Sequence, residues 1–463
     1  MKILPALFYL TRSFSDVKFN FESGGFMREE SDLKIFIRYV SLNIMSMIGL
    51  SCYILADTYY VANGLGADGL AALNLSIPVF SFITGAGLML GIGGGTRFAV
   101  LKAQEKHDEA ESVFMNMVYG AAFFALIYIF LGIFFPGKIA ELMGADQYTF
   151  ERTETYIRII LVFSPAFLMN NILNSFVKND GSPHIAMIAS VSGSIFNIIF
   201  DYIFIFPMGM GMKGAALATG TAPLAGLLVL SLHFIRKKNT FNFIKIKLIP
   251  EYFGICLPLG VPSLVTELSS GIVIIIFNIL IMNISGNTGI AAYGIIANIS
   301  LVVISVYTGI AQGIQPVVSN AYGKENRKRI KRVFNYAVRL SLLISVCIYL
   351  FLFIKTDMVV SLFNGENRMD LAEIAGTGIR LYFTAIPFAG LNIVMCSYFA
   401  SVENKIPAQF ISFARGFIII IPVVFIMSFM AGLEGIWLSF PLTEIATFIF
   451  AAIYLRKSKS VIR

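Results

Sequence analysis

Two aspartates stand within long apolar stretches of this sequence, where an ionised side chain is costly. The first, Asp57, lies in Ile-Leu-Ala-Asp-Thr-Tyr-Tyr-Val, near the end of an apolar run that starts around Ile35. A carboxylate at membrane depth costs at least about 2.5–3.5 kcal/mol, so it usually faces a water-filled path, a cation or a proton relay. The simpler alternative is an aspartate at a helix end that reaches the aqueous interface, and Asp57 alone does not exclude it.

The second aspartate, Asp201, belongs to a polar set far along the chain. Asn197 and Asp201 are four residues apart and so share one face of a helix, and Thr219 lies in the next apolar stretch. With Asp57, this set offers two carboxylates, an amide oxygen and a hydroxyl, which suit Na⁺ as a metal ligand set if Na⁺ is the bound ion. The same group suits a proton, because burial and a neighbouring like charge both favour a protonated carboxyl. Such a set, without an energy-coupling motif, indicates ion-coupled transport.

The second half of the sequence carries different acids. Glu267 follows a predicted proline kink at 257–259, and we expect it to contact a cationic substrate, with Asn174 as a further candidate for substrate binding. Glu444 has a possible partner in Arg415, and such a pair would be structural. The sequence has 43 phenylalanines, and some of their aromatic faces would attract planar, hydrophobic cations.

The composition is that of an integral membrane protein. The chain has 463 residues, is 57% hydrophobic and has only 13% charged residues, against about 25% in soluble domains. Apolar stretches of about 20 residues span a bilayer, and they must be helical because lipid cannot satisfy backbone polar groups. The sequence therefore predicts an all-α protein with twelve spans, near 35–56, 70–96, 111–135, 154–176, 184–206, 212–235, 252–282, 290–317, 333–354, 372–400, 406–430 and 433–455.

Lysine and arginine are concentrated in alternate connections. The connections after even-numbered spans and the C-terminal tail are rich in basic residues, with a dense run at 324–332, whereas those after odd-numbered spans hold few. The positive-inside rule then places both termini in the cytoplasm, in a multi-pass protein of the cell membrane. The net charge of +8 thus reflects topology and contact with membrane lipid, and we expect no nucleic-acid partner.

The chain also repeats itself. Gly66-Ala-Asp-Gly-Leu-Ala-Ala72 reappears as Gly286-Asn-Thr-Gly-Ile-Ala-Ala292, and residues 211–214 match 432–435 at nearly the same offset. We therefore expect two six-helix bundles, 31–235 with the cation site and 251–463, joined by a cytoplasmic linker at 236–250. Because six is even, the repeats are parallel, and rocking the bundles would open a central cleft to each side in turn.

The N-terminal residues 1–30 fit neither bundle. They are Phe-rich and weakly patterned, and their apolar stretch is too short to span a membrane. We expect a disordered extension, with Met27 as an alternative to Met1 for the start of translation.

Motifs of other function classes are missing from the sequence. There is no Gly-x-x-x-x-Gly-Lys-Ser/Thr phosphate loop, no Ser/His/Asp arrangement and no His-Glu-x-x-His motif. The three histidines lack metal-ligand spacing. We therefore expect neither an enzyme nor a bound cofactor, only a coupling ion.

Taken together, these segments resemble the multidrug and toxic compound extrusion (MATE) family, in loop style its bacterial multidrug-efflux branch. The resemblance covers about 30–455 and rests on Asp57-Thr-Tyr-Tyr-Val61, Gly181-Ser-Pro183, Asn197-Ile-Ile-Phe-Asp201, Gly214-Ala-Ala-Leu-Ala-Thr219 and Gln315-Pro316. It implies a V-shaped twelve-helix exporter that exchanges Na⁺ or H⁺ for organic cations. It also implies that Asp57, Asn197, Asp201 and Thr219 form the first-lobe cation site, and that Glu267 matches a second-lobe glutamate of some members.

The leading interpretation is a secondary active multidrug efflux transporter that exchanges H⁺ or Na⁺ for cationic amphipathic compounds, as a monomer. One alternative is a flippase or exporter of a lipid-linked or endogenous polar compound, which thirteen or fourteen spans and a strongly cationic cleft would favour. Another is a membrane receptor or channel, which would have to explain the buried acids without ion gradients.

Overall fold

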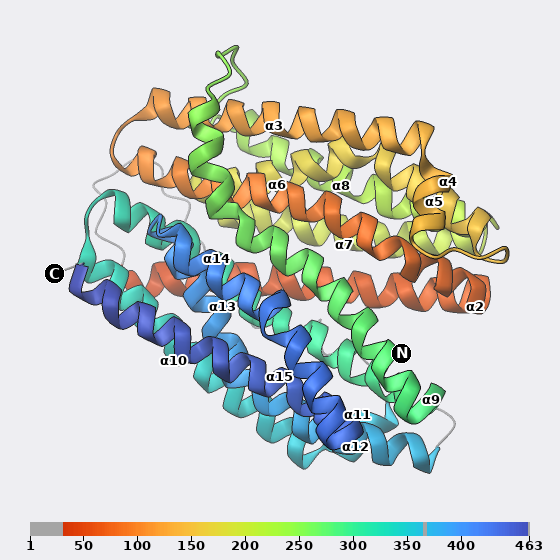
Figure 1. Cartoon of the computed structure of the whole chain (residues 1–463). Helices are drawn as coiled ribbons and strands as arrows, with labels where there is room; N and C mark the ends of the chain where they lie inside the picture. The colour runs from red at the N-terminus through yellow and green to blue at the C-terminus, as the bar shows by residue number, and fades with distance from the viewer. Residues whose placement is uncertain (1–30, 364–367, 462–463) are drawn as a thin grey trace, which may run out of the picture.

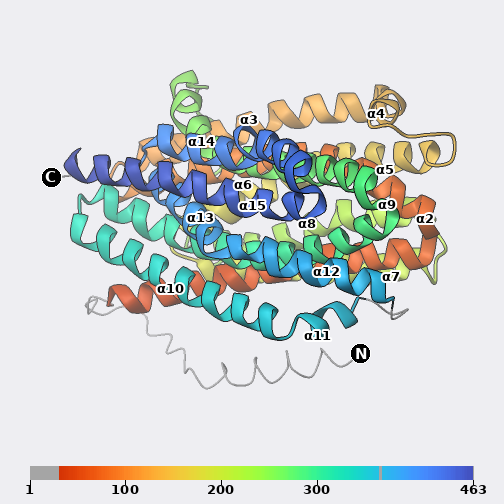
Figure 2. The same ribbon diagram turned by 60° about the horizontal axis from the view of Figure 1, so that its bottom comes forward.

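The computed structural model describes residues 31–363 and 368–461, and within these ranges the regular structure is helical with no strand. Figure 1 shows two sets of helices inclined to each other, with α3 and α6 nearly horizontal and α10 and α15 oblique, and Figure 2 shows most helices running along one direction. Eight helices are long and apolar enough to cross a membrane, or nine if one bent pair counts as a span. The all-α membrane fold is thus confirmed, while the predicted N-terminal extension lies outside the described residues.

The repeat is visible in the two longest helices, each of which contains two spans. Helix α2 (Asp32–Ala103) breaks at Gly66, with φ 72° and ψ −164°, and α9 (Pro250–Gly323) breaks at Gly286, with φ 60° and ψ −152°. Glycine adopts this left-handed backbone without a steric penalty, which explains why it recurs at the same place in both halves. The predicted pairing of these glycines is confirmed.

The first half continues with four further spans. Helices α5 (Phe150–Val162) and α6 (Ser164–Asn179) are bent by 49° and together make one span. Pro165 stands in the first turn of α6, where its missing N–H costs no hydrogen bond. The other elements are α3 (His107–Phe134), the short α4 (Pro136–Leu142), α7 (Pro183–Ile205) and α8 (Gly211–Ile235).

The second half follows the same order. Helix α12 (Met369–Tyr382), the 3-10 turn η1 (Phe383–Ala385) and α13 (Ile386–Ser401) form one broken span, and α15 (Ile420–Val461) breaks at Gly432. The remaining elements are α10 (Arg327–Ile354), the short α11 (Thr356–Ser361), α14 (Lys405–Phe413) and the π-helical η2 (Ala414–Ile418). With the merged helices divided at their breaks, the described residues contain twelve spans in two parallel repeats, as predicted.

One end of the molecule, which we call the basic end, carries the connections 104–106, 180–182, 236–249, 324–326 and 402–404. The two bundles make close contacts in the half of the molecule nearest to it. A Cβ on Gly260 of α9 would lie 1.9 Å from the backbone oxygen of Met89, and one on Gly313 would lie 2.7 Å from Val40 Cα. Arg97 closes the same end by donating to both carboxylate oxygens of Glu403, at 3.0 and 3.1 Å. Helices α2 and α9 therefore meet there at backbone distance.

The hydrophobic cores show that α2 and α9 also cross between the bundles. Two core clusters are built mainly from α2 to α8, and a third mainly from α9 to α15. However, Cys256 of α9 packs in a first-half core, while Phe36 and Tyr39 of α2 pack in the second-half core. Figure 1 shows the first part of α9, in green, lying across the first bundle. Each long helix therefore ties one bundle to the other.

Close approach at Gly260 yields a direct test. In Gly260→Ala the added methyl group would overlap the α2 backbone, so we expect the free energy of unfolding to fall by about 1–3 kcal/mol, as overpacking usually costs. The midpoint of thermal unfolding in detergent measures this. Gly254→Ala is the matched control, because a Cβ there meets no atom within 4 Å. Equal midpoints for the two variants would contradict the contact.

Candidate functional site

The predicted cation-site residues come from three helices of the first bundle. Asp57 lies on α2, Asn197 and Asp201 on α7, and Thr219 on α8. All four are buried, with exposed fractions of 7, 1, 0 and 4% respectively. The interface alternative for Asp57, a helix-end side chain in water, does not fit this burial.

The geometry brings these side chains into one polar group. Asn197 Nδ2 donates to Thr219 Oγ1 at 3.3 Å, and the carboxylates of Asp57 and Asp201 lie close enough to interact directly. Among the described residues, no hydrogen-bond partner reaches Asp57 Oδ1, Asn197 Oδ1 or either carboxylate oxygen of Asp201. Buried oxygens without partners carry a large desolvation cost. The group is therefore suited to a proton or a small cation.

Two tyrosines complete the surroundings of this group, and the sequence analysis missed both. Tyr156 of α5 is buried, contacts Thr219 through its hydroxyl, and lies within electrostatic range of both aspartates. Tyr53 lies within range of Asp57, Asp201 and Glu267. The spacing of Tyr53 four residues before Asp57 could have revealed it. Tyr156 gave no local signal, because its contact with Thr219 depends on how α5 packs against α8.

A cavity of about 150 Å³ lies between the bundles. The first bundle contributes Leu88, Ile92 and Lys178, and the second contributes residues that include Glu267. Asn174 is not among the lining residues, because its amide donates to Ala186 O and Ser190 Oγ, both at 3.0 Å, and so joins α6 to α7. The structure therefore brings Glu267, but not Asn174, to the cavity.

Arg415 also lines the cavity, and its charge is neutralised. Its guanidinium donates to Glu444 at 2.8 to 3.0 Å, and Asn392 Nδ2 donates to Glu444 Oε2 at 2.7 Å. The sequence left this pairing open, and the structure shows it. Within the described ranges, no cluster of three or more His, Cys, Asp or Glu side chains could hold a metal ion.

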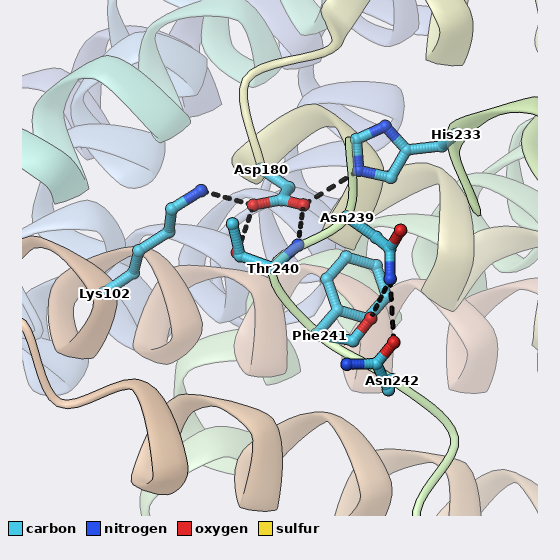
Figure 3. A network of polar contacts seen from close by, with 7 residues as sticks. All are labelled: Lys102, Asp180, His233, Asn239, Thr240, Phe241 and Asn242. Atoms are coloured by element: carbon cyan, nitrogen blue, oxygen red, sulfur yellow. Dashed lines mark hydrogen bonds and ion pairs between the residues drawn. The ribbon is translucent and has the colours of Figure 1, made fainter. Parts of the chain in front are cut away.

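A second polar cluster, which the sequence analysis also missed, anchors the segment between α8 and α9 at the basic end (Figure 3). Asp180 accepts hydrogen bonds from Lys102 and from the backbone N–H and hydroxyl of Thr240, and His233 Nε2 lies 2.8 Å from its Oδ2. Burial alone would raise the pKa of the Asp180 carboxyl. The hydrogen bonds from His233, Lys102 and Thr240 outweigh burial and hold the pKa below its usual value.

Phe241 fixes the same segment by packing. Its ring is fully buried against Phe98, Phe114 and Phe176, with centroid distances of 5.4, 4.5 and 5.8 Å. The start of the connection between the bundles is therefore part of the first bundle. Its later residues are also held there, because Ile246 and Ile249 form hydrogen bonds with Tyr119 and Asn116 of α3.

The Asp180 cluster predicts a pH-dependent stability difference. Because the folded-state pKa of Asp180 is depressed, its stabilisation is present above the ordinary aspartate value of about 4 and is lost as the pH falls through the lower folded value. We expect Asp180→Asn to lower the thermal unfolding midpoint at neutral pH, and its deficit against wild type to shrink in acid. The exposed Asp68→Asn is the control. A deficit that does not change with pH would contradict this role.

Comparison with known proteins gives one family. A family model described as MatE matches residues 43–203 and 262–426. The chain is 24% identical over 394 residues to the multidrug export protein MepA of Staphylococcus saprophyticus, and 25% identical over 395 residues to MepA of Staphylococcus aureus. In both cases the match covers 85% of this chain and 86% of the relative. A crystal structure of MATE in complex with MaL6 has the same fold, with a TM-score of 0.87 and 22% identity over 94% of this chain and 97% of that one.

Proposed function

Because this chain belongs to the MatE family, the multidrug and toxic compound extrusion family, we propose that it is a secondary active multidrug efflux transporter. In this proposal it exchanges H⁺ or Na⁺ for cationic amphipathic organic compounds. The chain is a multi-pass membrane protein with two parallel repeats, an architecture that supports alternating access. The observation that carries the proposal is the pair of adjacent, buried carboxylates at Asp57 and Asp201.

The aspartate pair supports ion coupling on physical grounds. Two carboxylates side by side in a low-dielectric bundle repel each other, so at least one needs a proton or a nearby cation. Among the described residues, no lysine or arginine supplies that charge to either aspartate. An ion taken from one side of the membrane would therefore bind here, with Asn197 and Thr219 offering further oxygens if the ion is Na⁺.

The proximity of this ion site to the cavity supports coupling to a substrate. Tyr53 lies within electrostatic range of both aspartates and of Glu267, which lines the cavity. Glu267 also packs against α2, since a Cβ on Gly85 would lie 3.4 Å from Glu267 Cβ. A charge change at the aspartates would therefore change the electrostatic potential at Glu267. We propose Glu267 as the group that binds the cationic part of a substrate.

The remaining features of the proposal concern organisation in the membrane. We propose bundles at 31–235 and 251–463 with a linker at 236–250, a monomeric state, and a plasma-membrane location with both termini cytoplasmic. In the cycle, the contacts at the basic end, such as Arg97 with Glu403, would break when the cleft opens to the cytoplasm. Twelve spans and the neutralised Arg415 favour a drug exporter over a flippase with a strongly cationic cleft.

The ion site gives the sharpest prediction. Asp57→Asn keeps the side-chain volume but removes the charge, so it should abolish gradient-driven dye efflux from proteoliposomes. Asp201→Asn should do the same, and the double variant should be hardly worse, because two members of one site are non-additive. Asp68→Asn serves as the exposed control. Wild-type efflux by Asp57→Asn at normal expression would refute the proposal.

Topology is tested by labelling single cysteines in a background without the four native ones. Asn326→Cys, at the basic end, should react with an impermeant thiol reagent only from the cytoplasm. Met369→Cys, whose parent side chain is 88% exposed near the opposite end, should react only from outside. Labelling of both positions from the same side would contradict the parallel arrangement of the repeats.

A further inference from the structure

Lys178 is an unusual lining residue of the interbundle cavity. It lies in the last turn of α6, and only 3% of its surface is exposed. Its Nζ donates to Asn43 Oδ1 at 3.2 Å and to Gln312 Oε1 at 3.3 Å. Both partners are neutral amides, and a buried ammonium without an anionic partner carries a high desolvation cost.

Other acids at the basic end and beside the cavity are already engaged elsewhere. Asp180, two residues later, accepts from Lys102 and Thr240 and lies against His233. Glu444 pairs with Arg415, and Glu403 pairs with Arg97. Among the described residues, no carboxylate lies within 4.0 Å of Lys178 Nζ, so this cation is not neutralised by the protein.

Glu267 lines the same cavity at a different level. It packs beside Gly85 of α2, whereas Ser175 and Asn179, which flank Lys178 on α6, pack beside Gly95. Ten residues of one helix separate these levels by about 15 Å, at about 1.5 Å per residue. Leu88 and Ile92 of α2 lie between the two levels and also line the cavity. The cavity therefore has an acidic group and a basic group separated by an apolar wall.

We propose that Lys178 is the anion-binding residue of this cavity, and that it sets the affinity for zwitterionic amphiphiles through their carboxylate. The cationic group of such a ligand lies toward Glu267, its apolar body lies against Leu88 and Ile92, and its carboxylate accepts from Lys178 Nζ. This inference rests on the proposed function, because it assigns a specificity-determining residue to the proposed cavity. A carboxylate gives Lys178 the charged partner that Asn43 and Gln312 do not supply.

A purely structural role for Lys178 is the competing explanation. Its two amide partners come from different halves of the chain, Asn43 from α2 and Gln312 from α9. Lys178 could therefore simply hold the bundles together at the basic end. A tie of this kind would affect every ligand alike, whereas an anion-binding residue affects only ligands with a carboxylate.

The test compares a rhodamine dye that carries a free carboxylate with its methyl ester, two ligands that differ only in the anionic group. Binding of each dye to the purified protein is measured by fluorescence anisotropy. We expect Lys178→Met to weaken binding of the acid at least about tenfold, as expected for loss of a charged hydrogen bond, and to leave the ester unchanged. Lys178→Arg should restore binding of the acid.

Two control variants complete the design. The exposed Lys213→Met should leave the binding of both dyes unchanged. Glu267→Gln should weaken the binding of both, because both carry the cationic xanthene. If Lys178→Met weakens the binding of the two dyes equally, Lys178 has a structural role and the proposal is overturned. A wild-type protein that binds only the ester would also overturn it.

The wild-type protein also provides a readout that does not depend on the folding of a variant. The acid should bind at least as tightly as the ester, although its net positive charge is lower; tenfold weaker binding of the acid would overturn the inference. Efflux of both dyes from proteoliposomes is measured in parallel. If the wild type binds both dyes with the expected Lys178 dependence but exports neither under any ion gradient, the proposed transport function fails and the binding inference stands.

Discussion

The structure depends on the electrostatic cost of holding two carboxylates next to each other inside an apolar bundle. Hydrophobic side chains at the positions of Asp57 and Asp201 would avoid the desolvation cost that these buried carboxylates carry. Their charges are instead left without a cationic partner among the described residues. A site of this kind has a free energy that changes strongly when a proton or a cation binds, and that change is what an ion gradient can act on.

In the proposed mechanism, the remainder of the fold would convert a local charge change into a movement of the two bundles. Helices α2 and α9 each contribute to both cores, so neither bundle can shift without moving them. At Gly260 and Gly313 the backbones of α2 and α9 are in direct contact. Helices packed this closely switch between discrete arrangements more readily than they deform gradually. The segment after α8 is held to the first bundle by Asp180 and Phe241. Its later residues are held there by hydrogen bonds of Ile246 and Ile249 to α3, so the whole connection belongs to the first bundle.

Much of this fold could be predicted from the sequence, because span length, glycine repeats and basic loops are local signals. The kinks at Gly66 and Gly286 follow directly from the repeated motif. The grouping of Asn197 with Asp201 also follows from helical spacing. The placements of Tyr156, Lys178 and Asp180 do not, since each depends on how distant helices pack. Asn174 illustrates the reverse problem, because an amide in a span looks the same in sequence whether it lines a cavity or joins two helices.

The most direct test of the central claim uses the reciprocity of coupling: if ion movement drives substrate export, a substrate gradient must drive ion movement in the opposite direction. Proteoliposomes are loaded with a cationic dye, diluted into dye-free buffer without an imposed ion gradient, and monitored for internal H⁺ and internal Na⁺. The account predicts that one of the two ions accumulates inside as the dye leaves, and that Asp57→Asn proteoliposomes show no such accumulation. Dye efflux through the wild-type protein with no movement of either ion would contradict the claim.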